Sequence, residues 1–407
     1  MTALFLPCAG GAEALLVDEV ARITGVGGES ARGGVWVEGD VRTAMQLNLE
    51  SRLAQRVLWP LIDGPYRDEH DLYDLARRVP WTDWISNEQT LRVDVSAMRS
   101  PLQSINFAAL RIKDAVCDVM RDATGARPSV DTRHPDLPLS LYLGPDHATL
   151  YADTSGEALF KRGWRDAQGG RQDVKGEAPL KETLAATMLA AAGWLGREDD
   201  GPLMDPFCGA GTIAIEAAQM ACSIAPGSLR RFAFERWIQF APQRAAWKEM
   251  KAMAQARVHA PLVPIYASDV SFRMTDFATR NAERAGVAQT IEFKTVDALQ
   301  RLPPTSAGTM LFNPPYGERI APKGTGQTHS RENFDDHTGA AEFFAALASH
   351  WKRHYAGWSA WCLSPEMKLP TLMRLKESRR VPMWNGPIEC RLFCFEMVAG
   401  SNKPTNS

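Results

Sequence analysis

The sequence has 407 residues, of which 45% are hydrophobic and 23% charged, and a formal net charge of −2 at pH 7. Such a length predicts two or three domains, and the composition is that of an ordinary globular protein. No run approaches the ~18 apolar residues that a membrane span needs, and residues 1–10 lack the basic start and long apolar core of a signal peptide. Neither an anchor nor secretion is therefore indicated, and we expect a cytoplasmic protein.

Seven cysteines, an odd number scattered through a long chain, argue against a disulfide framework. Cys390 and Cys394 fall on one face of an expected strand, and no further ligand pair is nearby. We interpret both as core residues and expect no metal site.

The first 160 residues predict an alternation of short strands and helices. Alternating apolar residues favour strands at residues 4–8, 34–38, 56–61, 89–95, 139–143 and 148–152. Helical periodicity favours helices at residues 11–24, 41–48, 68–79 and 106–123. In the last of these helices we expect the buried positions to be Phe107, Leu110, Ala115, Val119 and Met120. This order is typical of an α+β region, which we divide into residues 1–50 and 51–160.

The chain then passes through a basic segment into a linker. In KRGWR, three cations (Lys161, Arg162 and Arg165) surround a tryptophan, which is consistent with a phosphate contact where a small domain joins a large one. We take residues 161–176 as a linker because 166–176 are rich in Gly, Gln and Asp. Pro179 then opens an alanine-rich helix. We expect it to pack beneath the next motif, and a plain core helix is the alternative.

Residues 203–218, LMDPFCGAGTIAIEAA, join a strand to a helix through a glycine turn. Asp205 ends the apolar strand, Gly209 and Gly211 permit a tight turn, and Thr212 opens a helix whose N–H groups face that turn. Such a turn can cradle a nucleotide-like ligand, or it can be a purely structural joint.

The connection at residues 220–264 is unusually long. It interleaves Arg230, Arg231 and Arg236 with Phe232, Phe234 and Trp237. This pattern can bind a splayed single strand of nucleic acid, or it can belong to a helical hairpin that covers the sheet.

Two carboxylates follow at expected strand ends. The strand at residues 264–269 ends at Asp269, where an α/β nucleotide site accepts hydrogen bonds from the ribose hydroxyls. After a helix at 276–285 and a strand at 290–294, Asp297 is placed to accept from an adenine amino group.

A strand at residues 309–312 leads into Asn313, Pro314 and Tyr316. The side chain of Asn313 and the carbonyl of Pro314 can accept both hydrogens of an exocyclic amino group, while Tyr316 stacks on the base that carries it. A proline-rich turn with a capping asparagine is the alternative. Beyond it we expect helices at 340–354 and 369–376, a strand at 358–363, and a hairpin at 379–398 that turns at WNGP.

The glycine turn and the NPPY loop together resemble those of the S-adenosylmethionine-dependent amino methyltransferases. The whole chain is similar to the THUMP-domain RNA methyltransferases that make N2-methylguanosine in bacterial 23S ribosomal RNA. The motifs are specific from about residue 177 onward; in front of it the resemblance rests on SPLQSINFAALRIKDAV and DTSGEALFKRGWR. It implies an α/β fold with a seven-stranded Rossmann-like domain at 177–400 and a disordered tail at 401–407. In front lie a ferredoxin-like part at 1–50 and a THUMP domain at 51–160.

The resemblance also implies S-adenosyl-L-methionine as the cofactor. Its motifs place the catalytic residues at Asn313, Pro314 and Tyr316. They place cofactor-binding residues at Pro179, Leu180, Asp205, Pro206, Phe207, Cys208, Gly209, Gly211, Thr212, Asp269, Asp297, Ala298 and Asn313. Family members often carry a second acid two residues beyond the position of Asp269, where this chain has Ser271.

The implied activity is N2-methylation of a guanosine in structured RNA, after the base has flipped into the NPPY pocket. Some bacteria fuse a second methyltransferase to this one, and because this sequence stops before it, we expect one methylation activity. The loop leaves open a transfer RNA guanine-N2, a DNA adenine-N6 or a protein glutamine-N5 methyltransferase, and a non-catalytic RNA-binding scaffold.

The charge of the front region constrains how it could bind RNA. Residues 1–160 contain 15 lysines and arginines against 23 aspartates and glutamates. Binding there would need a local basic patch, for which the candidates are Arg92, Arg99, Arg111 and Lys113. The alternative, that these side chains are only solvated, stays open.

Overall fold

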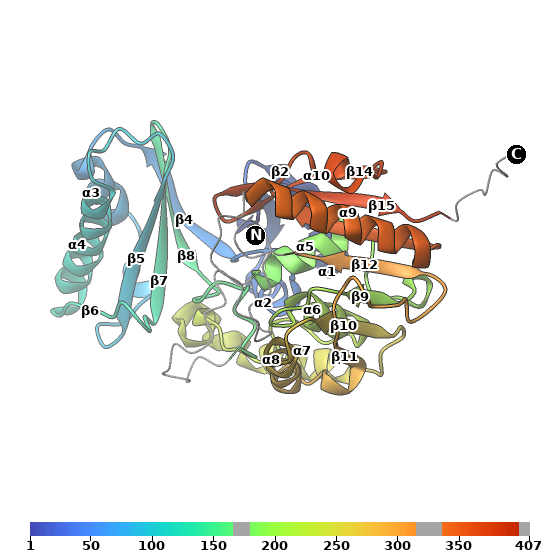
Figure 1. Cartoon of the computed structure of the whole chain (residues 1–407). Helices are drawn as coiled ribbons and strands as arrows, with labels where there is room; N and C mark the ends of the chain where they lie inside the picture. Colours follow the sequence, from blue (N-terminus) through green and yellow to red (C-terminus); the bar gives the residue numbers. More distant parts are fainter. Residues whose placement is uncertain (166–179, 315–335, 399–407) are drawn as a thin grey trace, which may run out of the picture. The chain divides into compact units, whose positions relative to one another are not determined.

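The structure is a computed structural model that describes residues 1–165, 180–314 and 336–398 (Figure 1). The chain forms two compact units. The first comprises Met1–Cys8, Leu16–Lys161 and Pro226–Ala256, and the second comprises Ala9–Leu15, Arg162–Ala225 and the chain from Arg257 onward.

The first unit is built on an eight-stranded sheet of order β2-β3-β1-β4-β8-β7-β5-β6. Its strands are β1 (Thr2–Pro7), β2 (Glu29–Ala31), β3 (Gly34–Gly39), β4 (Leu58–Pro65), β5 (Thr90–Ala97), β6 (Ser129–Val130), β7 (Leu137–Leu143) and β8 (His147–Asp153). β4 pairs antiparallel with β8, whereas β5 pairs parallel with β7. The helices are α1 (Glu13–Thr24), α2 (Val41–Glu50), α3 (Glu69–Arg77), the short η1 (Trp81–Asp83) and α4 (Ile105–Thr124). α3 and α4 pack on each other and cover one face of the β4 to β5 half of the sheet (Figure 1).

The long connection after the glycine turn contributes to the first unit. It forms η3 (Ala233–Arg236), η4 (Ile238–Gln243) and α7 (Arg244–Ala256). Backbone hydrogen bonds attach it, from Gly227 N–H to the Leu49 carbonyl and from Phe234 N–H to the Thr154 carbonyl. The aromatic rings of Phe232, Phe234 and Trp237 are buried, which favours the structural interpretation for them.

The second unit is a seven-stranded sheet of order β11-β10-β9-β12-β13-β15-β14. Its strands are β9 (Leu203–Asp205), β10 (Ile265–Asp269), β11 (Ile291–Thr295), β12 (Gly308–Phe312), β13 (Trp358–Ser364), β14 (Arg379–Asn385) and β15 (Ile388–Glu396). The first five are parallel, and β15 and β14 form an antiparallel hairpin. This confirms the predicted Rossmann-like methyltransferase fold, with its edge hairpin.

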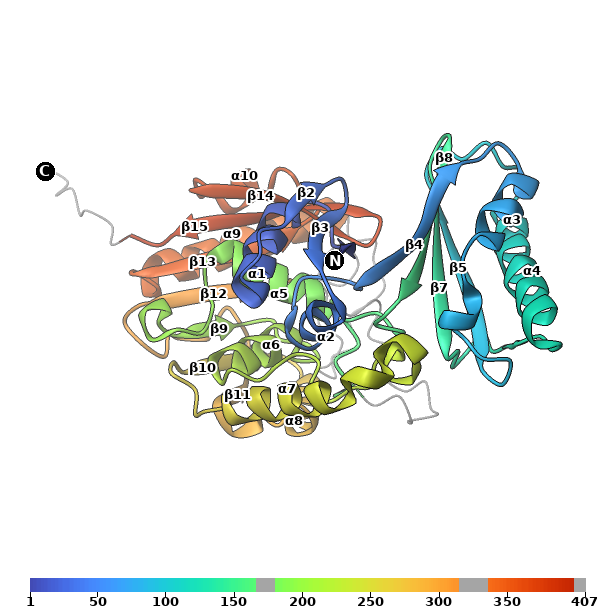
Figure 2. The same ribbon diagram turned by 180° about the vertical axis from the view of Figure 1, so that it is seen from behind.

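Helices cover both faces of this sheet (Figure 2). They are α5 (Glu182–Ala192), η2 (Glu198–Asp200), α6 (Thr212–Ala221), α8 (Phe272–Arg284), η5 (Ala288–Thr290), α9 (Asp336–His354) and α10 (Leu369–Met373). α5, α6 and α8 pack in one apolar core with Leu311, and α9 and α10 pack in another with Met310 and Phe312. Successive residues of β12 thus enter opposite cores, which explains the continuous apolar run TMLF. Cys390 and Cys394 are buried core residues, as predicted.

The buried face of α4 differs from the prediction. Phe107 and Leu110 are 60% and 50% exposed, and Val119 is only partly buried, whereas Ala115 and Met120 are buried as expected. The buried residues are Ala108, Ile112, Ala115, Val116, Cys117 and Met120. This stripe follows the helical period, and Phe107 and Leu110, which are three residues apart, share the opposite, exposed face of the helix. The prediction relied on the large apolar side chains and therefore chose the wrong residues for the buried face of α4.

None of the helices in the described ranges is both long and apolar enough to cross a membrane.

The two sides of α4 should respond differently to truncation. Leu110→Ala should change the free energy of unfolding by no more than about 0.5 kcal/mol because the side chain is already half exposed. Ile112→Ala should cost about 2–5 kcal/mol because it leaves a cavity in the core. Urea unfolding of both variants measures this difference, and equal destabilisation would contradict the observed orientation of α4.

Candidate functional site

The turn between β9 and α6 is shaped by two glycines in the left-handed region, Gly209 at φ +50° and Gly211 at φ +84°. A Cβ atom at Gly211 would lie 3.0 Å from the Cβ of Ala278, so a side chain there is excluded both by strain and by α8. At Gly209 the nearest atom to such a Cβ is the Met274 Cε at 4.0 Å. The space above Gly209 is therefore open, and a ligand can approach the backbone there.

Two carboxylates, Asp205 and Asp269, end adjacent parallel strands beside this turn. The Gly209 N–H donates to Asp269 Oδ2 at 3.1 Å, and the Ser271 N–H donates to Oδ1 at 2.9 Å. Asp205 Oδ1 accepts from the Phe207 N–H at 3.1 Å. Asp269 thus fixes the glycine turn and still has lone pairs for a ligand.

Burial controls the protonation of both acids. Asp205 is almost fully buried, and this desolvation, with a smaller contribution from the neighbouring Asp269 charge, raises its pKa to about 8. Burial also raises the pKa of Asp269, against the two N–H donors that favour its charged form. A cationic ligand group at this edge would favour the ionised form of each acid.

Asp297 and Asn313 extend the row of polar residues along the same sheet edge. Asp297 follows β11, which pairs with β10, and it accepts from the Leu299 N–H at 2.9 Å. Asn313 follows β12 on the other side of β9, is partly buried, and precedes the buried Pro314. The carboxyl edge of β11-β10-β9-β12 therefore brings together four of the predicted site residues. Tyr316 and Pro179, predicted for stacking and for the start of the helix, lie outside the described residues.

The remaining predicted cofactor residues surround the glycine turn. Phe207 packs its ring against Phe312, with ring centroids 5.4 Å apart, and the backbone N–H of Cys208 donates to the Ser268 carbonyl at 2.8 Å. Leu180, Pro206, Cys208, Thr212 and Ala298 are all buried.

The three cations of KRGWR each pair with an acid. Arg162 is buried and pairs with the buried Glu216, with its Nε 2.9 Å from Oε1. Arg165 lies 2.7 Å from Glu182 and donates to the Thr212 hydroxyl at 2.7 Å, so it joins the N-terminal ends of α5 and α6. Both guanidinium groups thus form ion pairs with acids of the second unit, and the Arg165 side chain stays 31% exposed. Lys161 pairs with Glu157 on the surface of the first unit.

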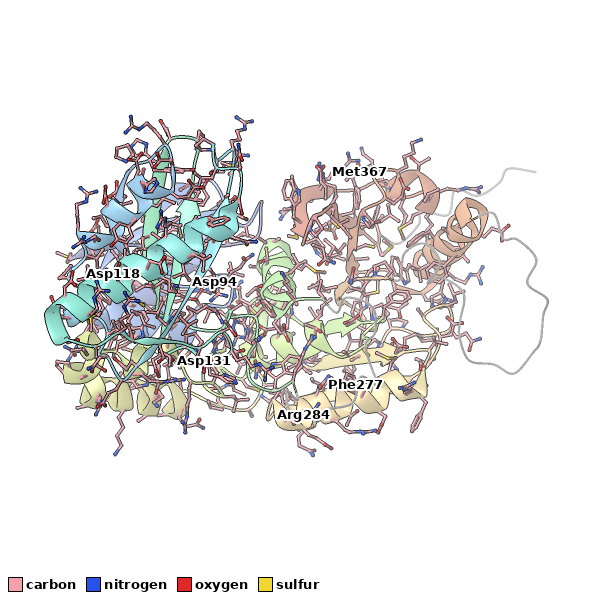
Figure 3. The ribbon with its side chains drawn as sticks, turned by 90° about the vertical axis from the view of Figure 1, so that its left-hand side faces the viewer. Asp94, Asp118, Asp131, Phe277, Arg284 and Met367 are labelled. Atoms are coloured by element: carbon pink, nitrogen blue, oxygen red, sulfur yellow. The ribbon has the colours of Figure 1, made fainter. Side chains whose placement is uncertain are left out.

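Sequence reasoning missed two side chains on α8 that support this site. Asn281 donates to the Ala210 carbonyl in the glycine turn at 2.8 Å, and Arg284 donates to the Trp164 carbonyl at 2.8 Å. Arg284 is labelled on α8 in Figure 3. Both residues belong to the polar face of a helix, and nothing in a single sequence separates them from solvated residues.

Two of the four candidate RNA-binding cations of the first unit are paired with acids. Arg92 lies 2.8 Å from Asp94, and Lys113 lies 2.7 Å from Asp114. Arg111 approaches only the ring of His70, at 3.5 Å. Figure 3 labels Asp94 and, on α4, Asp118, which pairs with Arg121 and Arg127. Arg99 is set apart by its left-handed backbone, at φ +58°.

Among the described residues no cluster of His, Cys, Asp and Glu side chains could hold a metal ion.

Three known protein families match, between them, most of the chain. The family described as RMKL-like, methyltransferase domain, matches residues 169–393. A THUMP domain matches residues 66–153, and an RlmL ferredoxin-like domain matches residues 3–58.

Individual proteins agree with these families. The ribosomal RNA large subunit methyltransferase K/L of Shewanella amazonensis is 36% identical over 388 residues, which are 93% of this chain and 51% of that protein. The chain thus spans about half the length of the curated relatives it matches. A putative methyltransferase crystallised with SAH has the same fold, with a TM-score of 0.83 and 24% identity over 98% of this chain and 99% of that chain. A possible methylase from Clostridium difficile covers all of both chains with a TM-score of 0.82 and 25% identity.

The raised pKa of Asp205 predicts a pH-dependent stability. Because the folded state holds this proton more tightly than the unfolded chain, the stabilisation is complete below about pH 4 and is lost as the pH rises towards 8. In Asp205→Asn, the free energy of unfolding should therefore fall less between pH 5 and 8 than it does in the wild type. Urea titrations across this range measure the two slopes, and parallel curves would contradict the raised pKa.

Proposed function

The chain belongs to the family of RMKL-like methyltransferase domains that carry a THUMP domain, and from this we propose that it methylates the N2 atom of a guanosine in 23S ribosomal RNA. S-adenosyl-L-methionine is the methyl donor, and the reaction takes place in the cytoplasm. The observation that carries the proposal is the row of Asp297, Asp269 and Asn313 at one sheet edge beside an open glycine turn.

The residues at this edge fit the chemical groups of the cofactor. The open backbone at Gly209 leaves room for its body, and Asp269, already fixed by two N–H donors, accepts from the two ribose hydroxyls. Asp297 accepts from the adenine amino group. Asp205 and Asp269 supply negative charge for a cationic amino acid and sulfonium. When bound, the cofactor supplies a methyl group activated by its positively charged sulfur.

Asn313 and Pro314 orient the nucleophile. The exocyclic nitrogen of guanine is a weak nucleophile, so positioning supplies most of the acceleration. The oxygen of the Asn313 amide and the Pro314 carbonyl accept the two amino hydrogens, direct the nitrogen lone pair towards the methyl group, and stabilise the positive charge that develops during attack. Tyr316 supplies the stacking surface for the flipped base in this proposal.

The THUMP domain supports an RNA substrate over DNA or protein, although the NPPY loop suits any planar amino group. The large-subunit name of the relatives supports ribosomal RNA over transfer RNA.

Loss of the Asp269 carboxylate should weaken cofactor binding. Each charge-assisted hydrogen bond to a ribose hydroxyl is worth about 1.5–3 kcal/mol, so Asp269→Ala should reduce the affinity at least about tenfold. Isothermal titration calorimetry measures this, with Asp276→Ala, a partly exposed acid in the second turn of α8, as the acidic control. An affinity within twofold of the wild type would remove Asp269 from the ribose site.

Asn313→Ala should lower methyl transfer by about 10²–10³-fold while cofactor and RNA affinities stay within twofold, because its hydrogen bonds matter mainly in the transition state. Transfer is measured from tritiated cofactor to ribosomal RNA of a strain that lacks this protein, followed by digestion to nucleosides. Label in N2-methylguanosine supports the proposal. Label in N6-methyladenosine or in protein would refute it.

A further inference from the structure

A cavity of about 200 Å³ lies in the first unit, whereas the residues assigned to catalysis and cofactor binding belong to the second unit. Its walls come from α2, η3, η4 and α7, and its lining residues are Met45, Phe234, Glu235, Phe240, Arg244 and Trp247. Small-molecule sites usually measure roughly 300–1,000 Å³, so this cavity suits a single planar ring system better than a whole cofactor.

The walls are aromatic and held in place by one another. The ring centroids of Phe234 and Phe240 are 5.0 Å apart, and those of Phe234 and Trp247 are 5.1 Å apart in an edge-to-face arrangement. Phe232 stacks on the far side of Phe234, with its centroid 5.5 Å away. These packed rings give the cavity an aromatic lining, which favours a flat aromatic ligand.

Positive charge follows the cavity along one face of α7. This helix packs on α2, and Figure 2 labels both. Arg244, Trp247, Lys248 and Lys251 occupy positions i, i+3, i+4 and i+7 of this helix, and the Lys251 Nζ lies 5.0 Å from the centroid of the Trp247 ring. Arg244, Lys248 and Lys251 are exposed, and within the described parts of the chain none of them forms an ion pair. We call these three residues the α7 basic stripe.

The stripe contrasts with the rest of its unit. Residues 226–256 contain six lysines and arginines against two glutamates, whereas residues 1–160 are strongly acidic. Elsewhere in the unit many arginines are neutralised by neighbouring acids, as at Arg56 and Arg236. A row of unpaired cations beside an aromatic cavity matches a polyanion that carries flat rings.

We propose that this cavity binds one unpaired nucleobase of the RNA substrate, while the α7 basic stripe contacts the phosphates on either side of it. The proposal rests on the proposed RNA methyltransferase function and adds a second base site to it. Glu235 gives the site a preference. Its Oε1 accepts from the Phe232 N–H at 2.8 Å, and the carboxylate has further acceptor capacity for a base with an amino group, such as cytosine, rather than uracil.

The phosphate contacts are tested by salt dependence in the full-length protein. Each phosphate contact contributes about 0.7 to the slope of log affinity against log salt for single-stranded RNA. Arg244→Gln/Lys248→Gln/Lys251→Gln should therefore bind a single-stranded RNA dodecamer at least tenfold more weakly at low salt, with a slope reduced by about 2. The control Arg22→Gln/Arg67→Gln/Arg78→Gln removes three exposed cations of the same unit and should leave the slope nearly unchanged. Equal slopes for the wild type and the α7 variant would overturn the proposal.

The base site is tested by crosslinking and by base preference. RNA that carries 5-iodocytidine should crosslink, on irradiation, to peptides that contain Phe234, Phe240 or Trp247, and Phe240→Leu should reduce this yield severalfold without loss of the folded state in thermal unfolding. Oligocytidine should bind tighter than oligouridine, and Glu235→Gln should diminish the difference. Crosslinks only outside residues 226–256, or binding of an acidic peptide in place of RNA, would overturn the proposal.

Methyl transfer separates this proposal from the proposed function. With saturating RNA the α7 variant should transfer methyl groups at a rate within twofold of the wild type, because the stripe touches neither cofactor nor target base. Normal transfer with unchanged RNA affinity would refute the second base site alone, whereas loss of N2-methylguanosine formation by the wild type would refute the function.

Discussion

The parallel pairing of β10, β9 and β12 is the constraint on which the site depends. Parallel strands that are neighbours end at the same edge of the sheet, so Asp269, Asp205 and Asn313 lie together there. In the sequence, more than a hundred residues separate Asp205 from Asn313. The glycine turn completes the edge. It can lie against α8 only because Gly211 has no side chain and Ala278 has a small one, and the Asn281 amide holds the turn by its Ala210 carbonyl. Packing and hydrogen bonding thus leave one open face, above Gly209.

Buried charges secure the surroundings of this edge. The Arg162 and Glu216 pair is almost entirely removed from solvent, and Arg165 joins Glu182, at the start of α5, to Thr212, at the start of α6. Burial, opposed by Arg165, raises the pKa of Glu182 to about 7. A buried pair contributes little net stability when both partners are present, but loss of one partner leaves an uncompensated charge. The two pairs therefore fix the position of the first residues after the THUMP domain relative to the glycine turn.

In the first unit, the acidic and the basic surfaces come from different segments of the chain. Its sheet and the helices α1 to α4 come from the acidic residues 1–160. Its basic stripe lies on α7, in a segment inserted between β9 and β10 of the second unit's sheet. Arg230 anchors this insertion by donating to the backbone carbonyls of Ser155, Glu157, Ala158 and Lys161. A segment that follows the glycine turn in sequence thereby completes the unit that contains the THUMP domain.

The sequence alone determined the elements and the motif chemistry. Apolar periodicity located nearly all the strands and helices, because a strand buried on both faces, such as TMLF, and a glycine turn have local signatures. β2 was missed because it has three residues and little apolar content. The strand-end acids were located because Asp205 and Asp269 end their strands and Asp297 lies two residues beyond its own. The protonation of Asp205 could not be predicted in the same way, because its raised pKa depends on burial by other segments of the chain.

Only the tertiary structure decided which charged and apolar side chains are free. Arg162 and Arg165 have the same local sequence signature as phosphate-binding residues, yet Glu216 and Glu182, distant in sequence, neutralise them. Phe107 and Leu110 are large and apolar, yet the buried stripe of α4 passes beside them. In the insertion, the basic and aromatic pattern left both binding and packing open, and the fold assigned packing to Phe232 and Trp237 and exposure to Arg244 and Lys248. Burial depends on contacts between distant segments of the chain, so it cannot be predicted from the local sequence.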